Sequence, residues 1–187
     1  MNILHKSFSK WGPVPKRPVA SLRRIIGQRM VESWTTVPHV TQFDEADITE
    51  LMELRKKWSA AYEAQGARLT LTCFALKAVV QVLKKLPIFN SSLDEAAQEI
   101  VLKDYFHIGI AVDTEGGLIV PVIRDVDKKS LVMLATELNE LAVKARDRKV
   151  SLDDLKGGSF TISNQGGIGG GHFTPIVNKP EVAILGL

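Results

Sequence analysis

The sequence predicts a layered domain in which helices and strands alternate along the chain, an α/β or α+β arrangement. Three observations carry this prediction. Apolar residues recur at helical spacing in four long segments. Short β-type runs bounded by turn residues lie between and after these segments. The last part of the chain holds a strand that enters a glycine-rich turn, GGSFTISNQGGIGGGHFTPIVN.

The composition is that of an ordinary globular domain and limits the partners. The 187 residues are 45% hydrophobic and 24% charged, enough for one well-formed core. The net charge of +3 is too small to indicate nucleic-acid binding but suits an anionic ligand. A single cysteine excludes an intrachain disulfide and favours a reducing compartment, so we expect a cytoplasmic protein. No apolar run has membrane-spanning length, and we expect no membrane partner.

The first elements are an arm, a helix and a strand. Residues 1–18 are rich in Pro, Lys and Ser and predict an N-terminal arm, with the folded domain over 19–187. A helix over 19–34 ends before Pro38, because the residue before a proline avoids the helical region. Side chains alternate over 39–46, which predicts a strand with mixed faces.

Two helices with clear start and stop signals follow. The first, over 47–65, opens with a capping-box pattern, an acid followed three residues later by Glu, and Gly66 stops it. The second is capped by Thr70 or Thr72 and is apolar on most sides, so we expect it to be buried. Pro87 ends it.

Short strands come next. Two of them, over 90–93 and 100–102, flank an acidic turn. Two more, over 107–112 and 118–123, flank the sequence DTEGG, which indicates a hairpin or tight turn.

The rest of the chain alternates between helix and strand. Ser130 caps a long amphipathic helix. A short capped turn of helix is predicted at residues 151–155. The strand that ends at Ser163 and the final strand EVAILGL, residues 181–187, complete the layered domain.

The glycine-rich turn is not a dinucleotide fingerprint. Starting from Gly167 and Gly169, the third glycine position is occupied by His172, and the following residues are extended rather than helical. No Walker lysine follows. The turn alone is explained by a flexible connection between two strands. The other interpretation is a ligand site, because Ser163 and Asn164 lie where the backbone turns sharply.

The histidines and the cysteine give no catalytic or metal pattern. No two of the histidines lie at metal-ligand spacing, so we expect no metal. Each is explained as a surface or structural residue; the four are His5, His39, His107 and His172. Cys73 lies in an apolar helix and is expected to be a small buried residue.

Two charged features allow two interpretations each. Arg55, Lys56 and Lys57 form either a solvated helix face or a grip on phosphate, for which the planar guanidinium of Arg is suited. Asp113 is either a turn former or an acceptor for the amide or hydroxyl of a ligand.

Several segments, in this order, resemble one family: VPHVTQFDEADITELMELR, HIGIAVDTEGGLIVPVIRD, GGSFTISNQGGIGG and FTPIVNKPEVAILGL. They are similar to the catalytic domain of dihydrolipoamide acyltransferases, the core subunits of 2-oxo-acid dehydrogenase complexes. The resemblance covers nearly the whole chain after the arm. The first segment is most similar to the bacterial pyruvate branch, which carries acetyl groups.

The resemblance implies a fold, an assembly and a reaction. The fold is chloramphenicol-acetyltransferase-like, and trimers with active sites between subunits join into cages. The reaction passes an acyl group between dihydrolipoamide and coenzyme A, which is a substrate here. The implied partners are a dihydrolipoyl domain and the other subunits of a dehydrogenase complex.

The resemblance also implies roles for particular residues. Ser163 stabilises the oxyanion of the tetrahedral intermediate. The residues implied to contact coenzyme A are Arg55, Thr70, Asp113, Ser163, Asn164 and Gly167, the last at a position where members of the family can have a hydroxyl side chain.

One part of the family pattern is missing. In the family, a histidine in a DHRxxDG-type motif takes the proton from the attacking thiol, and no DHR occurs in this sequence. We therefore expect a catalytic domain without its C-terminal part that turns over poorly or not at all. The lipoyl group is expected on another domain. The alternatives are a non-catalytic assembly subunit on the same fold and an unrelated α/β module that binds a small molecule.

Overall fold

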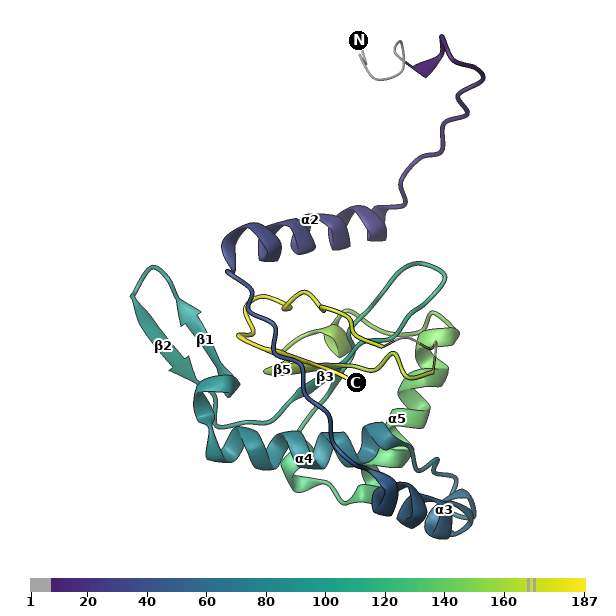
Figure 1. Ribbon diagram of the computed structural model, residues 1–187, viewed down its shortest axis with the longest axis vertical. Coiled ribbons are helices and arrows are strands. Elements are labelled where there is room, and N and C mark those ends of the chain that lie inside the picture. The colour runs from purple at the N-terminus through teal and green to yellow at the C-terminus, as the bar shows by residue number, and fades with distance from the viewer. Residues whose placement is uncertain (1–7, 168, 170) are drawn as a thin grey trace.

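A four-stranded mixed sheet lies at the centre of the molecule (Figure 1). The structure is a computed structural model, and it describes residues 8–167, 169 and 171–187. The helices within these residues are α2 (Ser21–Thr36), α3 (Thr49–Glu63), α4 (Leu71–Lys85) and α5 (Leu131–Arg146), and the short 3₁₀ turns are η1 (Pro87–Asn90), η2 (Val126–Lys128) and η3 (Asp153–Leu155). The strands are β1 (Ser91–Asp94), β2 (Glu99–Leu102), β3 (Ile108–Ile110), β4 (Val122–Ile123), β5 (Phe160–Ser163) and β6 (Ile184–Gly186). Within the described residues, three helices are followed by four strands, then by α5 and two more strands, so helices and strands are interleaved, as the sequence predicts.

The central sheet has the strand order β4-β3-β5-β6. β3, β5 and β6 run parallel, with Ile110 opposite Ile162 and Ser163 opposite Gly186, whereas β4 is antiparallel to β3. Parallel strands end at the same edge of a sheet, which is where ligands bind in many open sheets. The residues that follow β3 and β5 therefore share that edge.

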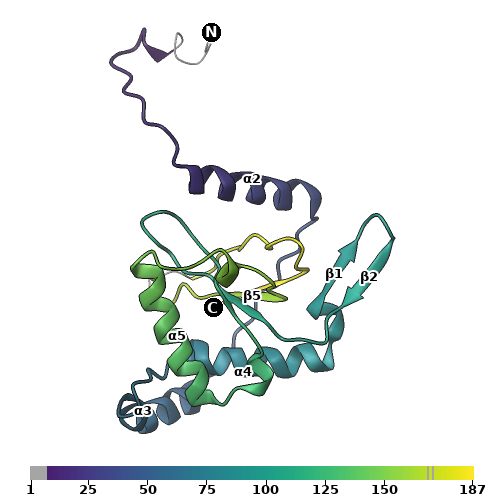
Figure 2. The same cartoon turned by 180° about the vertical axis from the view of Figure 1, so that it is seen from behind.

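α4 and α5 pack on one side of this sheet. Leu76 and Val80 of α4, Leu134 of α5, and Ile108 and Ile162 of the sheet are fully buried in one cluster. Burying one such side chain contributes about 1.5–3 kcal/mol, so this cluster holds β3 and β5 firmly on α4. Figure 2, seen from behind, shows α4 on this side of the sheet and α2 on the other.

α3 lies at the end of the molecule where α4 begins (Figure 1). A second buried cluster joins the two, formed by Ala67, Leu69, Cys73 and Ala135, with Tyr62 of α3 packed against it. The start of α4 is therefore fixed between α3 and α5.

The structure confirms the predicted strand pairs. β1 and β2 form an antiparallel pair, and an isolated bridge between Val112 and Ile119 extends the β3–β4 hairpin toward its turn. The predicted cap of α5 is also present, because the Ser130 hydroxyl accepts a hydrogen bond from the N–H of Met133 at 3.2 Å.

The prediction of a strand over 39–46 is wrong. These residues have no regular secondary structure, although they pass close to residue 177. The N–H of Val177 donates to Nε2 of His39 at 3.0 Å, so a side chain makes the contact that a backbone carbonyl would make in a β-ladder. Alternation of side chains predicted an extended chain but not which atoms it bonds.

The predicted N-cap of α3 is displaced by one residue, from Asp47 to Ile48. Asp47 accepts hydrogen bonds from both the N–H and the hydroxyl of Thr49, and the helix begins at Thr49 with Ile48 as its N-cap. Asp47 thus closes a turn before the helix instead of forming a capping box. The predicted stop is confirmed, since Gly66 has φ +72°, a conformation that glycine adopts without strain.

Residues 8–20 precede α2. They extend outward from the rest of the molecule and lead into the start of that helix (Figure 1). Residues 1–7 of the predicted arm, and Ile168 and Gly170 of the glycine-rich turn, lie outside the described residues. Among the helices that the structure describes, none is both long and apolar enough to cross a membrane.

Candidate functional site

The carboxyl edge of the parallel strands brings three predicted site residues to one end of the sheet. Ser163 is the last residue of β5, and Asn164 follows it. The N–H of Ala111 donates to the carbonyl of Ile162, so Asp113 leaves β3 at the same edge. Asp113 is exposed, and within the described residues no hydrogen bond joins it to Ser163 or Asn164.

Ser163 combines a fixed backbone with an available hydroxyl. Its side chain is 9% exposed, and its carbonyl accepts the N–H of Leu187 at 2.9 Å. Its Oγ has no hydrogen-bond partner in the part of the chain that the structure describes. A hydroxyl held on a rigid strand and left without a partner is able to donate to a ligand oxygen.

Asn164 links the sheet edge to the beginning of α4. Its Nδ2 donates to the hydroxyl of Thr72 at 3.2 Å, and its Oδ1 accepts the N–H of Gly166 at 2.9 Å. The second bond closes a turn of the kind that Asn side chains favour. Gly167 follows in an exposed position, and a Cβ added there meets no atom within 4 Å, so space alone does not require glycine at that residue.

The first turn of α4 is a defined helix N-terminus. Of the two predicted caps, Thr70 and Thr72, the N-cap is Thr70, and its N–H and hydroxyl lie 3.5 and 3.3 Å from Sγ of Cys73. The thiol therefore takes the place that Glu has in an ordinary capping box. The backbone N–H groups at a helix start are directed outward and attract negative charge.

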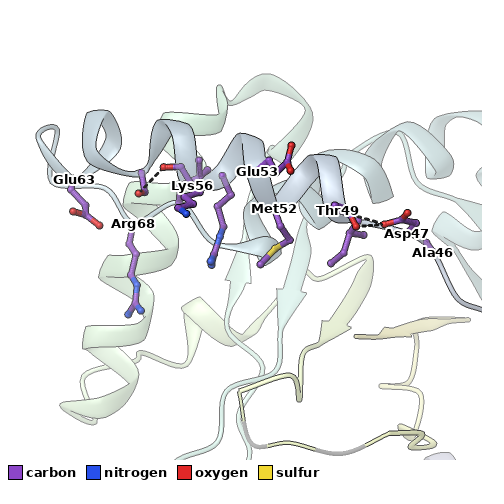
Figure 3. Close-up of a pocket in the computed structure, with 12 residues that line it drawn as sticks. Ala46, Asp47, Thr49, Met52, Glu53, Lys56, Glu63 and Arg68 are labelled. Carbon is purple, nitrogen blue, oxygen red and sulfur yellow. Dashed lines mark hydrogen bonds between the residues drawn. The ribbon is translucent and has the colours of Figure 1, made fainter.

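A cavity of ≈ 820 Å³ lies beside this helix start, between α3 and the α3–α4 connection. Arg55, Lys56 and Arg68 are its basic lining residues, and Leu69 lines it immediately before the Thr70 cap. Figure 3 shows Lys56 on α3 and the Arg68 side chain extending from the connection.

Asp47, Glu53 and Glu63 also line this cavity, but none of them forms an ion pair with either of its arginines. Among the described residues, neither Arg55 nor Arg68 forms an ion pair, so Arg55 does not pair with Glu50 or Glu53. Arg55 is also half-buried. Two unpaired guanidinium groups at one cavity and next to a helix start favour an anionic ligand.

The sequence reasoning missed Arg68. The sequence does show a basic residue two positions before the cap of a helix. That Arg68 lies beside Arg55, however, depends on how the α3–α4 connection turns back toward α3, which the sequence pattern does not show. The turn of α4 from Thr70 to Thr72 then connects the two parts of the candidate site. It follows the cavity residue Leu69 and contacts Asn164 at the sheet edge.

His107 and His172 have structural partners. Nδ1 of His107 accepts the N–H of Asp125 at 3.0 Å, and the ring of His172 packs edge-on against Phe43 at 4.8 Å between centroids. Within the described residues, no group of three or more His, Cys, Asp or Glu side chains is arranged to hold a metal ion.

The sequence matches a known family along most of its length. Residues 13–187 match the family model of the 2-oxoacid dehydrogenases acyltransferase (catalytic domain). The chain is 52% identical over 180 residues to the dihydrolipoyllysine-residue acetyltransferase component of the pyruvate dehydrogenase complex of Pseudomonas aeruginosa, covering 96% of this chain and 33% of that protein. The component with the same description from Haemophilus influenzae is 48% identical over 182 residues, covering 96% and 32%. This chain therefore spans about a third of the length of these relatives.

Solved structures agree with this match. The dihydrolipoamide acetyltransferase of Azotobacter vinelandii, solved to investigate a serine, a histidine and an asparagine in its catalytic mechanism, has a TM-score of 0.93 and 52% identity, covering 96% of this chain and 74% of that one. The cubic core of a pyruvate dehydrogenase multienzyme complex gives the same values. A truncated catalytic core of the 2-oxoacid dehydrogenase complex of Thermoplasma acidophilum has a TM-score of 0.87 and 40% identity, covering 93% and 79%. These likenesses confirm the predicted fold class.

Proposed function

Because this chain belongs to the 2-oxoacid dehydrogenase acyltransferase family, we propose that it serves acetyl transfer between dihydrolipoamide and coenzyme A in the core of a bacterial pyruvate dehydrogenase complex. The acetyltransferase relatives support the choice of acyl group. The lipoyl group is a substrate carried by another domain.

The observation that carries this proposal is the unpaired pair of arginines beside the start of α4. Coenzyme A brings phosphate groups, which need cations that stay charged and make directed hydrogen bonds. Arg55 and Arg68 line one cavity, and the N-terminal turn that Thr70 caps adds the positive end of a helix dipole. We propose that these groups hold the nucleotide phosphates, and that the rest of the coenzyme extends past Thr72 toward Asn164.

At the sheet edge, the reaction needs a donor for developing negative charge. When the thiolate of one substrate attacks the thioester carbonyl of the other, a new C–S bond forms and the carbonyl oxygen becomes an oxyanion. The free hydroxyl of Ser163 is the group we propose to donate to it. The intermediate then collapses, the old C–S bond breaks, and the departing thiolate takes up the proton that the attacking thiol gave to the base. A serine is among the residues studied in the mechanism of the Azotobacter enzyme. Asp113 and Gly167 remain proposed contacts at the same edge.

The proton of the attacking thiol needs a base, and the DHRxxDG-type histidine of the family does not occur in this sequence. A positioned general base contributes about 10²- to 10⁴-fold to rate. We propose that the 187 residues by themselves supply coenzyme contacts and the oxyanion donor but transfer acetyl groups negligibly.

We further propose that the folded domain, residues 19–187, assembles into trimer-based oligomers, and that residues 1–18 are an arm outside it. The related cubic core supports such an assembly. Its partners are dihydrolipoyl domains and the other subunits of the complex.

Replacing Arg55 or Arg68 with Ala tests the proposed coenzyme grip. Each change removes a charged hydrogen-bond donor, so we expect coenzyme A binding to weaken by about 1.5–3 kcal/mol. Pantetheine, which lacks the nucleotide phosphates, is expected to bind each variant as it binds the unchanged chain. Isothermal titration calorimetry with both ligands measures the difference.

Lys57→Ala is the matched control, because Lys57 lies on the same helix, outside the cavity lining, with its Nζ 5.8 Å from the centroid of the Trp58 ring. Equal weakening of both ligands, or of neither, contradicts the proposed phosphate contact. A chain that oligomerises but binds no coenzyme A is instead an assembly subunit.

A further inference from the structure

The segment between α2 and α3 lies along the C-terminal segment that follows the glycine-rich turn. We call residues 33–43 the clamp segment. The N–H of Lys179 donates to the hydroxyl of Ser33 at 3.3 Å, and the N–H of Val177 donates to Nε2 of His39 at 3.0 Å. Further along, the Phe43 ring meets the His172 ring edge-on. Side chains of one segment thus hold the other from residue 172 to residue 179.

His39 is the central contact of the clamp segment. Its Nδ1 lies 2.8 Å from the carbonyl of Val37, which only accepts hydrogen bonds, so Nδ1 carries the ring proton. Its Nε2 is then free to accept the N–H of Val177, a residue that is 8% exposed. The Trp34 ring packs 5.5 Å from the imidazole centroid and fixes its orientation further. The imidazole is therefore held in one tautomer by partners on both nitrogens.

The held segment is also attached to β5. Thr161 of β5 donates its hydroxyl to Glu181 at 2.7 Å, and Nδ2 of Asn178 donates to the same carboxyl group at 3.3 Å. On the other side of the glycine-rich turn, Asn164 is fixed by Thr72 and Gly166. Both ends of the turn are therefore anchored, and the His39–Val177 bond is the anchor that comes from the clamp segment.

We propose that His39 is a positioning residue: through its hydrogen bond to Val177, the clamp segment holds the turn after Ser163 in the arrangement that binds coenzyme A. This inference rests on the proposed function. His39 itself contacts no substrate. Without the hydrogen bond between His39 and Val177, the segment after the glycine-rich turn is held less tightly. The residues next to Ser163 and Asn164 can then take other conformations. Losing one hydrogen bond of this kind lowers affinity about three- to tenfold if its whole effect reaches the ligand site.

Two conservative substitutions separate this role from general stability. In His39→Gln the side-chain oxygen reaches the place of Nε2 and accepts the N–H of Val177. In His39→Asn the side-chain amide of the shorter residue lies where Nδ1 of His39 lies, and it does not reach the N–H of Val177. Val40→Ala is the control, because Val40 is the next residue and is 95% exposed.

The experiment measures amide hydrogen exchange and coenzyme A affinity on the whole chain. With His39→Asn, we expect faster exchange at Val177 and at Gln165–Gly167, unchanged exchange at the sheet residues Ile108 and Ile162, and about three- to tenfold weaker binding. His39→Gln restores both readouts, and Val40→Ala changes neither.

Other outcomes overturn the inference in recognisable ways. If His39→Asn speeds exchange at Val177 but leaves the affinity for coenzyme A unchanged, the clamp segment does not position the coenzyme site. The inference is then wrong, and the proposed function is unaffected. Faster exchange throughout the sheet shows a loss of global stability instead of positioning. No coenzyme A binding by the unchanged chain overturns the proposed function, and the inference with it.

Discussion

At the residue scale, one face of β5 carries two polar side chains with different surroundings. Thr161 and Ser163 are two residues apart and so point to the same side of the strand. Thr161 is fully buried and gives its hydroxyl to Glu181, whereas the hydroxyl of Ser163 has no partner among the described residues. The Thr161 hydroxyl therefore stabilises the fold, whereas the Ser163 hydroxyl is available to a ligand.

Glu181 has a perturbed acidity that predicts a pH-dependent stability. Burial raises its pKa from 4.5 to about 7, and hydrogen bonds from Thr161 and Asn178 together with the charge of Lys103 only partly oppose this. Because the folded-state pKa is raised, the folded protein favours the protonated acid. Unfolding free energy is therefore expected to fall as pH rises from about 4.5 to about 7 and to change little above that through this group.

Glu181→Gln is expected to remove this dependence, since the amide keeps the shape and does not ionise. Its oxygen still accepts from Nδ2 of Asn178, and its NH2 group donates to the Thr161 hydroxyl in place of the bond that this hydroxyl now donates. At pH 8 the variant is expected to be more stable than the unchanged chain by at most about 3 kcal/mol, from about 1.4 kcal/mol per pKa unit, and at pH 4.5 nearly equal to it. Urea denaturation at the two pH values measures this. Exposed Glu99 supplies the control Glu99→Gln, and parallel pH curves for Glu181→Gln and the unchanged chain contradict the prediction.

Ser163 gives a second prediction at this scale. The 187-residue chain is expected to show negligible transfer between acetyl-coenzyme A and dihydrolipoamide, and a longer version that includes a DHRxxDG segment is expected to be active. In that version, Ser163→Ala is expected to raise the barrier by about 3–4 kcal/mol, because an oxyanion donor is lost, with coenzyme A affinity nearly unchanged. Steady-state kinetics and calorimetry separate the two quantities. A loss confined to binding identifies Ser163 as a coenzyme contact only. Turnover by the 187-residue chain shows that the base is already present.

At the element scale, the positions of helices and strands were largely predictable, but the way in which the chain joins them was not. The helix that Ser130 caps and the strand that ends at Ser163 follow from apolar periodicity and local caps, which act within a few residues. The strand predicted over 39–46 failed because its neighbour, the segment at Val177, bonds to the His39 side chain. Arg68 was missed for a related reason: its place beside Arg55 depends on a connection whose path the sequence pattern does not encode.

Two glycines are expected to affect stability in opposite directions when each is replaced by Ala: Gly66 follows the end of α3, and Gly27 lies inside α2. Gly66 has φ +72°, so Gly66→Ala forces a side chain into the left-handed region and is expected to cost about 1 kcal/mol. Gly27 lies inside α2 with open space around its Cβ position, so Gly27→Ala is expected to stabilise that helix by about 0.5–1 kcal/mol. Thermal unfolding followed by circular dichroism gives both values. If both substitutions shift stability in the same direction, the helix-stop explanation for Gly66 is wrong.

At the scale of the whole molecule, α2 is poorly covered by its own chain. Ser33 is its one buried residue, while Ile25 and Val31 are 50% and 63% exposed. The tip of the β3–β4 hairpin touches the other side of the helix, where a Cβ at Gly117 would lie 3.3 Å from Ile26. A helix of ordinary length gains most of its stability from burying an apolar face, so the exposed side of α2 is expected to be covered by another copy.

This surface predicts self-association that depends on α2. The unchanged chain is expected to form trimer-based oligomers, and Ile25→Glu combined with Val31→Glu is expected to shift it toward monomers, because buried carboxylates without partners are costly at an interface. Gln28→Glu adds one charge to the same helix without removing apolar surface, and it is expected to leave the assembly nearly intact. Sedimentation velocity at micromolar concentration measures the three proteins, with circular dichroism confirming that the body remains folded. If the unchanged chain is monomeric, the exposed side of α2 does not hold copies together. The same conclusion follows if Gln28→Glu dissociates the oligomer as much as the double variant does, because the apolar residues of α2 are then not what the assembly depends on.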